Sequence, residues 1–254
     1  MSEVVLTEVD GGVMTITLNR PEAKNAVNLA MAQGIAAALD ELDGNDDIRC
    51  AILTGAGGTF CSGMDLKAFV SGEVPYIAGR GFGGLTEAPP AKPLIAAIEG
   101  YALAGGCELA MACDLVVAAE TARFGIPEVK RGLAAAAGGL VRFPRQLPYR
   151  VAMELALTGD FMDAERALAL GFINQTVAEG EAAAGAQALA GKIAANGPLA
   201  VKLSKQVVRE SEDWSSADMF SRQQEILQPV FTSEDAIEGA TAFAEKRAPN
   251  WKGR

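Results

Sequence analysis

Apolar and polar residues alternate at the start of the chain in a pattern that predicts a β-hairpin followed by an amphipathic helix. Val4–Val9 and Val13–Leu18 have the composition of two strands, and Asp10-Gly11-Gly12 between them supplies turn residues. Asn28 is a suitable helix N-cap, and apolar residues recur at helical spacing through Leu29–Leu42. The chain is therefore expected to open with a hairpin that packs against a helix.

Short apolar runs alternate with helical segments through the middle of the chain, which is typical of an α/β domain. We expect buried strands at Arg49–Thr54, Leu94–Ile98, Leu115–Ala119 and Phe172–Val177, and helices at Cys107–Cys113, Arg150–Leu157 and Ala164–Leu170. Strand signals end near Glu179, and the remaining segments predict helices at Ala182–Asn196, Leu199–Glu210, Ser215–Leu227 and Ser233–Arg247. Ser215 with Asp218, and Thr232 with Asp235, have capping-box spacing. The pattern indicates an α/β body over residues 1–190 and a helical region over residues 191–254.

The stretch Pro93–Asp114 joins an apolar strand to a helix that opens with glycines and contains one acid. Ala104-Gly105-Gly106 precede the helix, where free backbone N–H groups and the helix dipole favour negative charge. Glu108 lies one turn into an otherwise apolar helix, so burial should oppose its ionisation. This combination favours a site in which a proton moves beside a developing anion.

A second isolated acid, Glu128, follows a bend and precedes an alanine- and glycine-rich turn at residues 132–139. Each acid also has an ordinary structural interpretation: Glu108 could pair with a basic residue, and Glu128 could lie on a solvated loop beside Lys130 and Arg131. The segment Ser71–Lys92 has no periodicity, and long irregular segments in compact domains are usually functional or mobile. We expect it to form a flexible wall of the ligand site.

The composition excludes several kinds of function. The 254 residues contain no histidine, which removes histidine-based triads and nearly all zinc sites, and the four cysteines form no CxxC pair, so no metal is expected. The formal charge of −10 disfavours nucleic acid and anionic membranes as partners, and no apolar run is long enough to span a membrane. Cysteines in small or apolar surroundings are expected to be reduced, which favours a cytoplasmic location.

Several ordered blocks of the chain resemble the crotonase family, the enoyl-CoA hydratases and isomerases, over essentially its whole length. The blocks are Leu18-Asn19-Arg20-Pro21 with Lys24-Asn25-Ala26, Phe60–Lys67, Ala96–Asp114, Phe124–Gly139, Leu157-Thr158-Gly159 and Ala242–Arg247. The resemblance implies a spiral of ββα units with a C-terminal helical trimerisation region, assembled as homotrimers or dimers of trimers. It also implies an acyl-CoA thioester as substrate and no separate cofactor, because coenzyme A is part of that substrate.

The resemblance assigns roles to particular residues. The amides of Met64 and Gly105 would form an oxyanion hole, and Glu108 and Glu128 match the two catalytic glutamates of the family's hydratases. Isomerases commonly keep only the equivalent of Glu128, so the presence of both favours water addition or removal. The family's coenzyme A contacts fall on Lys24, Ala26, Ser62, Asp65, Leu66, Phe243 and Lys246. Two of these have a structural alternative, Asp65 as an anchor for its loop and Lys246 as a solvated lysine, and Cys107 is expected to be core rather than a nucleophile.

The chain departs from the family pattern at the first position of the glycine triplet, which is Ala104, and at Leu133–Ala137, where proline and glycine are usual. Ala136, near the expected catalytic water, is not the aspartate that dienoyl isomerases carry. The C-terminal tail resembles that of the carnitinyl-CoA dehydratases. We predict an enoyl-CoA hydratase of the fatty-acid β-oxidation type, a hydro-lyase that converts 2-enoyl-CoA to 3-hydroxyacyl-CoA. The alternatives are another crotonase reaction, such as carnitinyl-CoA dehydration or double-bond isomerisation, and a non-catalytic acyl-CoA-binding relative.

Overall fold

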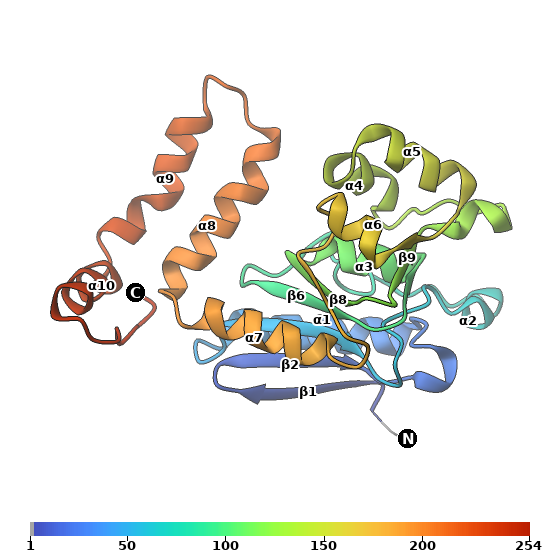
Figure 1. Ribbon diagram of the computed structural model, residues 1–254, viewed down its shortest axis with the longest axis horizontal. Helices are drawn as coiled ribbons and strands as arrows, with labels where there is room; N and C mark the ends of the chain where they lie inside the picture. The colour runs from blue at the N-terminus through green and yellow to red at the C-terminus, as the bar shows by residue number, and fades with distance from the viewer. Residues whose placement is uncertain (1–2) are drawn as a thin grey trace.

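Six strands form the main sheet, in the order β1-β2-β3-β6-β8-β11 (Figure 1). β1 and β2 pair antiparallel, and every later neighbour in the sheet pairs parallel. This computed structural model describes residues 3–254, so residues 1 and 2 of the predicted first region lie outside it. The strands are β1 (Val5–Asp10), β2 (Val13–Leu18), β3 (Cys50–Gly55), β6 (Leu94–Ile98), β8 (Leu115–Ala119) and β11 (Gln175–Val177).

The predicted hairpin and first helix are confirmed. Asp10 pairs with Val13 across the turn, whose Gly11 and Gly12 have φ values of 55° and 79°, as a tight two-residue turn requires. Helix α1 (Leu29–Gly44) begins after Asn28, whose side chain accepts a 3.0 Å hydrogen bond from the N–H of Met31. That cap satisfies one of the amides that the first turn of a helix leaves without a partner.

The two faces of the main sheet belong to different parts of the core. On one face, side chains such as Val13, Cys50 and Ile95 pack against helix α7 (Ala182–Ala194). On the other face, side chains such as Met14 and Leu53 join the larger core. Strands buried on both faces are apolar throughout, which is why the parallel strands could be recognised from their sequences.

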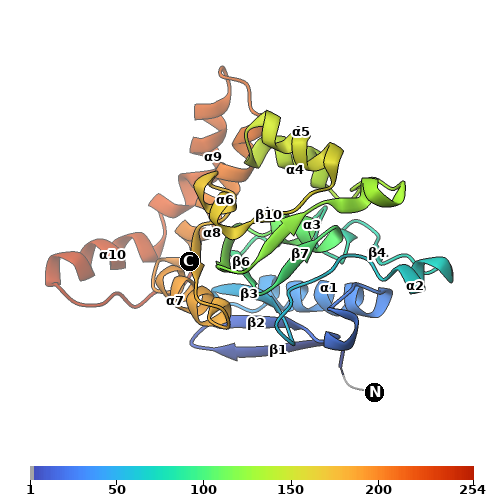
Figure 2. The same cartoon turned by 45° about the vertical axis from the view of Figure 1, so that its right-hand side comes forward.

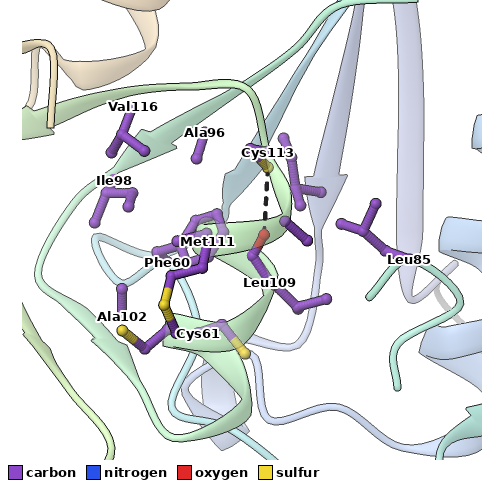
Figure 3. Close-up of a cluster of buried hydrophobic side chains, with 14 of the residues drawn as sticks. Phe60, Cys61, Leu85, Ala96, Ile98, Ala102, Leu109, Met111, Cys113 and Val116 are labelled. Carbon is purple, nitrogen blue, oxygen red and sulfur yellow. Dashed lines mark hydrogen bonds between the residues drawn. The ribbon is translucent and has the colours of Figure 1, made fainter. Parts of the chain in front are cut away.

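A second, three-stranded sheet lies beside the larger core (Figure 2). Its strands are β7 (Tyr101–Leu103), β9 (Arg123–Gly125) and β10 (Met162–Asp163), with β9 in the centre. Helix α3 (Gly105–Ala112) follows β7 directly, and all its residues are buried. Its apolar side chains pack with those of β6, β7 and β8 and with Phe60, Cys61 and Leu85 (Figure 3). The packing fixes α3 on all sides, so its first turn has a defined position.

The remaining short elements carry or support the cavity described below. They are helix α2 (Leu66–Val70), the strand pair β4 (Tyr76–Ile77) and β5 (Gly81–Phe82), the 3-10 helix η2 (Pro127–Arg131), and helices α4 (Gly139–Gln146), α5 (Tyr149–Thr158) and α6 (Ala164–Ala169). The predicted strand at Phe172–Val177 is shorter than expected, because only Gln175–Val177 pairs with β8.

Helices α8 (Pro198–Glu210), α9 (Met219–Phe231) and α10 (Glu234–Glu245) extend away from the sheet (Figure 1). The prediction that this region is helical is confirmed, but two of its details are wrong. Helix α9 begins at Met219 rather than Ser215, since the Ser215 hydroxyl bonds to the carboxylate of Asp218 at 2.8 Å and caps no backbone amide. Helix α10 is capped by Ser233, one residue after Thr232, and Ser233 accepts from the N–H of Ala236.

Candidate active site

A cavity of about 760 Å³ opens between α2, the β4–β5 segment, the start of α3, η2 and the turn that precedes α4. Met64, Gly105, Glu108 and Glu128 all line it. Its other lining side chains are mostly apolar, among them Leu66, Phe69, Val74, Phe82, Leu133, Ala134, Ala136 and Phe161. The fold therefore brings the four residues expected to be catalytic to the wall of one largely apolar cavity, as ligand sites commonly are.

The two predicted oxyanion donors, Met64 and Gly105, come from loops that touch. A Cβ atom added to Gly63 would lie 3.2 Å from the nitrogen of Gly105, which places the two loops in contact. On either side of Met64, the carbonyl of Gly63 accepts from Val27 at 2.8 Å and Asp65 donates to Val27 at 2.9 Å. Among residues 3–254, neither the N–H of Met64 nor that of Gly105 donates to another backbone group. Two fixed amides at the cavity wall are thus available to a ligand oxygen.

Packing explains why Gly105 is glycine. A Cβ atom at this position would collide with the ring of Phe82, which packs over the first turn of α3. The preceding residue, Ala104, has φ 51° and ψ −128°, a conformation that glycine adopts far more readily than alanine. The departure from the family's glycine triplet therefore stores backbone strain immediately before the donor amide.

Glu108 is only 3% exposed, and a backbone turn holds its carboxylate. Its Oε1 atom accepts hydrogen bonds from the N–H groups of Ala137 and Gly139, both at 2.8 Å. Burial raises the pKa of Glu108, whereas the two hydrogen bonds and the charge of Arg142 oppose that rise. Among residues 3–254 no basic side chain forms an ion pair with Glu108, so the simple ion-pair interpretation is not supported.

Glu128 lies in η2 with its carboxylate turned inward. Its Oε2 atom is buried and has no hydrogen-bond partner among the described residues. The pKa of Glu128 is raised to about 7, chiefly by burial and also by the nearby charge of Glu108, against the opposing effects of its own backbone N–H and of Arg131. The solvated-loop interpretation is wrong for this carboxylate, although it describes the exposed side chains of Lys130 and Arg131. Lys130 pairs with Asp160 at 2.7 Å.

The predicted coenzyme A residues fall into four groups. Ser62 and Leu66 line the cavity. Asp65 caps α2 by accepting from the N–H groups of Lys67 and Ala68, and it forms a 2.9 Å ion pair with Arg20, so its carboxylate anchors the loop. The side chains of Lys24 and Ala26 do not line the cavity, and the Lys24 ammonium lies 5.6 Å from the ring centre of Tyr101.

Phe243 and Lys246 lie at the end of α10, which extends away from the cavity of the same chain. The phenyl ring of Phe243 is 87% exposed. Lys246 does not share a helical face with Phe243, because α10 ends at Glu245 and Lys246 has φ 55°. Their predicted contact with a neighbouring subunit remains a prediction.

The segment Ser71–Lys92 does supply a wall of the cavity, through Val74, Tyr76 and Phe82. It is not an irregular surface loop throughout: β4 and β5 pair, and the side chains of Phe82 and Leu85 are buried in the core. Its glycines at positions 81, 83 and 84 adopt positive φ values, which lets the chain turn tightly there.

Three features of the site were not predicted from the sequence: the amides of Ala137 and Gly139, the ring of Phe82 and the guanidinium of Arg142. Gly138 and Gly139 open α4 in the way that Gly105 and Gly106 open α3, so the same glycine signal was present for the first of these features. Phe82 and Arg142 reach the site only through tertiary packing.

Comparison with known proteins places the chain in a family. The model of the family "Enoyl-CoA hydratase/isomerase" matches residues 8–254. The chain is 44% identical to enoyl-CoA hydratase EchA19 of Mycobacterium tuberculosis over 98% of its own length and 96% of that protein's. It is 40% identical to a carnitinyl-CoA dehydratase of Proteus mirabilis over the whole of both chains. A crystal structure of an enoyl-CoA hydratase from M. tuberculosis superposes with a TM-score of 0.98 at 58% identity, again over both whole chains.

Two further features were sought in the part of the chain that the structure describes. No cluster of three or more Cys, Asp or Glu side chains within residues 3–254 has an arrangement that could hold a metal ion. Over the same residues, no helix combines the length and the apolar character needed to cross a bilayer.

Proposed function

This chain belongs to the enoyl-CoA hydratase/isomerase (crotonase) family, and on that premise we propose that it is an enoyl-CoA hydratase, which adds water reversibly to a 2-enoyl-CoA thioester to give a 3-hydroxyacyl-CoA. The observation that supports this reaction best is the pair of unlike carboxylates in one cavity. Glu108 accepts two backbone hydrogen bonds, whereas Glu128 has an unpartnered buried oxygen and a pKa of about 7. Water addition needs one group that accepts a proton and one that donates it.

In the proposed reaction, the thioester oxygen accepts hydrogen bonds from the amides of Met64 and Gly105. Negative charge develops on that oxygen as the nucleophile adds, and one well-placed donor of this kind contributes about 3 kcal/mol to transition-state stability. Ionised Glu108 takes a proton from the water whose oxygen bonds to Cβ. Protonated Glu128 donates its proton to Cα, which leaves both atoms of the former double bond saturated. The reverse steps remove water.

The surroundings of each carboxylate suit its role. The amides of Ala137 and Gly139 stabilise the negative charge on Glu108, so they favour its ionised form as a base. Within residues 3–254 no such donor reaches the buried oxygen of Glu128, and the charge of Glu108 further disfavours a second negative charge in the cavity. The two groups are coupled, and the raised pKa of Glu128 leaves this carboxyl partly protonated near neutral pH.

The same proposal covers the substrate's coenzyme A portion and the assembly of the protein. Ser62 and Leu66, which line the cavity, would contact the coenzyme A portion, and Lys24, Ala26 and Asp65 would complete its binding site. Phe243 and Lys246 would reach the coenzyme A of a neighbouring subunit in a homotrimer or a dimer of trimers. Exposed apolar side chains on α8–α10 support self-association through residues 191–254: Val208, Phe220, Phe231 and Ile237 are each more than two-thirds exposed.

Two simpler expectations accompany the proposal. The reaction needs no separate cofactor, because coenzyme A is part of the substrate. A cytoplasmic location is supported by the four cysteines, all of which are buried and unpaired.

Carnitinyl-CoA dehydration is the second candidate, because a carnitinyl-CoA dehydratase is 40% identical over the whole chain. The acyl group of that substrate carries a quaternary ammonium, which favours aromatic faces or carboxylates. The cavity lining includes aromatic rings and the carboxylates of Glu108 and Glu128, which suit such a group, and the cations Lys130 and Arg131, which would repel it. Lys130 is already paired with Asp160, so Arg131 is the lining cation that favours a neutral acyl chain.

Loss of the conjugated enoyl absorbance tests the proposal when crotonyl-CoA and crotonobetainyl-CoA are each mixed with the purified protein. We expect the absorbance to fall with crotonyl-CoA and to change much more slowly with crotonobetainyl-CoA. The opposite preference would establish the second candidate. Binding of both esters without any absorbance change, at every chain length tried, would identify a non-catalytic acyl-CoA-binding protein.

A further inference from the structure

Arg142 lies in the first turn of α4, and its guanidinium packs against the turn that holds Glu108. A Cβ atom added to Gly138 would collide with Nη1 of Arg142, so the guanidinium occupies the space beside this glycine. Gly138 stands between Ala137 and Gly139, whose two amides donate to Glu108. Gly138 also has φ 109°, a conformation that few other residues adopt, so the turn depends on an unhindered glycine at this position.

The other edge of the same guanidinium reaches the turn that follows Phe82, a residue of the cavity wall. Nη2 of Arg142 donates a 2.5 Å hydrogen bond to the carbonyl of Thr86. The N–H groups of Leu85 and Thr86 both donate to the carbonyl of Phe82, so these residues form one tight turn. The ring of Phe82 packs over Gly105, the predicted oxyanion donor. One side chain therefore connects the turn that holds the base with the turn that packs against the donor.

The charge of Arg142 has no ion-pair partner among residues 3–254, although its side chain is half-buried. The titratable groups that act on it are Glu108 from α3, Cys113 at the end of α3, Arg145 from its own helix and Arg209 from α8; burial raises the pKa of the Cys113 thiol, so this group is neutral near pH 7. Burial and the two arginines lower the pKa of Arg142, and Glu108 opposes them. A half-buried cation without an ion pair is an unfavourable placement for stability alone, and such placements are commonest at functional sites.

We propose that Arg142 is a positioning residue: it holds the Ala137–Gly139 turn against the Phe82 turn, so that the carboxylate of Glu108 and the amide of Gly105 keep a fixed relative position. This inference rests on the proposed hydratase function for its catalytic consequence, but its structural part does not depend on that function. Small displacements between reacting groups are costly, and an error of about 1 Å can lower a rate roughly 10²-fold.

Three variants separate the charge of Arg142 from the geometry of its guanidinium. Arg142→Met removes both the charge and the donors, Arg142→Lys keeps the charge but not the planar guanidinium that reaches both turns, and Arg145→Met is the matched control on the same helix. Arg145 is exposed and pairs with Glu212 and Asp213, away from the cavity. For each protein, kcat and KM for crotonyl-CoA are measured across pH, and amide hydrogen exchange is followed over residues 71–92 and 132–139.

For Arg142→Met we expect kcat to fall roughly 10²-fold with little change in KM. The acid limb of the kcat/KM profile should move to higher pH, because the loss of a nearby positive charge raises the pKa of Glu108. Exchange should accelerate in both turns. Arg142→Lys should return the acid limb towards that of the parent while kcat stays low, and Arg145→Met should match the parent in every measurement.

An Arg142→Met protein with the parent's kcat, pH profile and exchange rates would overturn the proposal. Should that variant fail to fold, Arg142→Lys decides: a parent-like kcat and parent-like exchange would overturn the proposal, and a low kcat with the parent's acid limb would support it. An inactive parent would instead count against the hydratase function. Exchange alone then tests whether Arg142 joins the two turns, and unchanged exchange in Arg142→Met would overturn that part.

Discussion

The two glutamates of the cavity lie in surroundings that differ chiefly in how many backbone donors each one meets. The turn before α4 gives Glu108 two N–H groups at 2.8 Å, whereas η2 leaves the buried Oε2 of Glu128 without a partner. Both carboxylates have raised pKa values because both are buried. Burial alone therefore does not determine whether a carboxyl group acts as a base or as a proton donor. Local donors keep one carboxylate oriented and favour its ionisation, and their absence leaves the other able to hold a proton near pH 7.

The largest effect expected from this difference is on the rate after Glu128→Gln. An amide cannot donate a proton and regain it in each cycle, so the hydration rate with crotonyl-CoA should fall by roughly 10²–10⁴-fold. Initial rates from the enoyl absorbance measure this change. Glu165→Gln, at an exposed glutamate on α6, is the control and should leave the rate unaltered. A Glu128→Gln enzyme as active as the parent would remove Glu128 from the proposed mechanism.

Replacing Glu108 should lower the free energy of unfolding more than replacing Glu128 does. Glu108→Ala leaves the amides of Ala137 and Gly139 buried without their acceptor, and each such loss costs about 1–3 kcal/mol. Glu128→Ala removes a carboxylate oxygen that has no partner, so its effect on the free energy of unfolding should be smaller. Urea unfolding of both variants at the same pH tests the contrast. Equal losses would show that the two surroundings do not differ energetically.

The pH dependence of kcat/KM and that of stability should both reflect the titration of Glu128. A proton donor must be protonated, so kcat/KM should decline as pH rises through about 7, the pKa of this group in the folded protein. The same group should affect stability, since its pKa is raised from 4.5. Its stabilising contribution is fully present below pH 4.5 and is lost as pH rises through about 7. Chemical unfolding at several pH values, compared with that of Glu128→Gln, measures this loss, and identical pH dependence in the two proteins would contradict it.

The smallest effect concerns the backbone that leads into the Glu108 helix. Ala104 has φ 51° and ψ −128°, whereas no non-glycine residue of η2 has positive φ. Ala104→Gly should relieve strain of about 1–3 kcal/mol, partly offset by the greater freedom of glycine in the unfolded chain, for a net gain of about 1 kcal/mol. The urea midpoint should rise while the hydration rate changes little. A lower midpoint would mean that the Ala104 methyl group contributes packing that outweighs the strain.

Elements with a local apolar pattern were predictable, and those without one were not. Helix α1 was found because its apolar residues recur at helical spacing behind a good cap at Asn28. Helix α9 was misplaced by four residues because its first residues, Met219 and Phe220, are exposed, so no packed apolar residue marks where it begins. Capping-box spacing at Ser215 was misleading, since its hydroxyl found the Asp218 carboxylate instead of a backbone amide. A polar residue near a helix start has several competing partners, and sequence does not rank them.

The residues of the site likewise divide into those that a local sequence pattern marks and those that it does not. Gly105 and Glu108 could be picked out because glycines that open a helix and an acid inside an apolar one are local signals. The roles of Phe82 and Arg142 could not, because their partners lie far away in the sequence: Phe82 covers Gly105, and Arg142 bonds to Thr86. The alanine-rich turn was noted as a departure from the family pattern, and in the structure its amides hold Glu108.

By itself, the sequence determined the α/β body and the helical C-terminal region, which rest on residue type and short-range spacing. The family and the two candidate acids came from the resemblance of ordered blocks along the chain, which also needs no knowledge of the fold. Only the tertiary structure decided that Glu108 is held by two amides while Glu128 is not, and that Arg142 connects the two turns. Hydrogen bonding and desolvation act over a few ångströms of space, whereas residues 86, 108, 128 and 142 are brought within that range only by the packing of α3 against α4 and the β4–β5 segment.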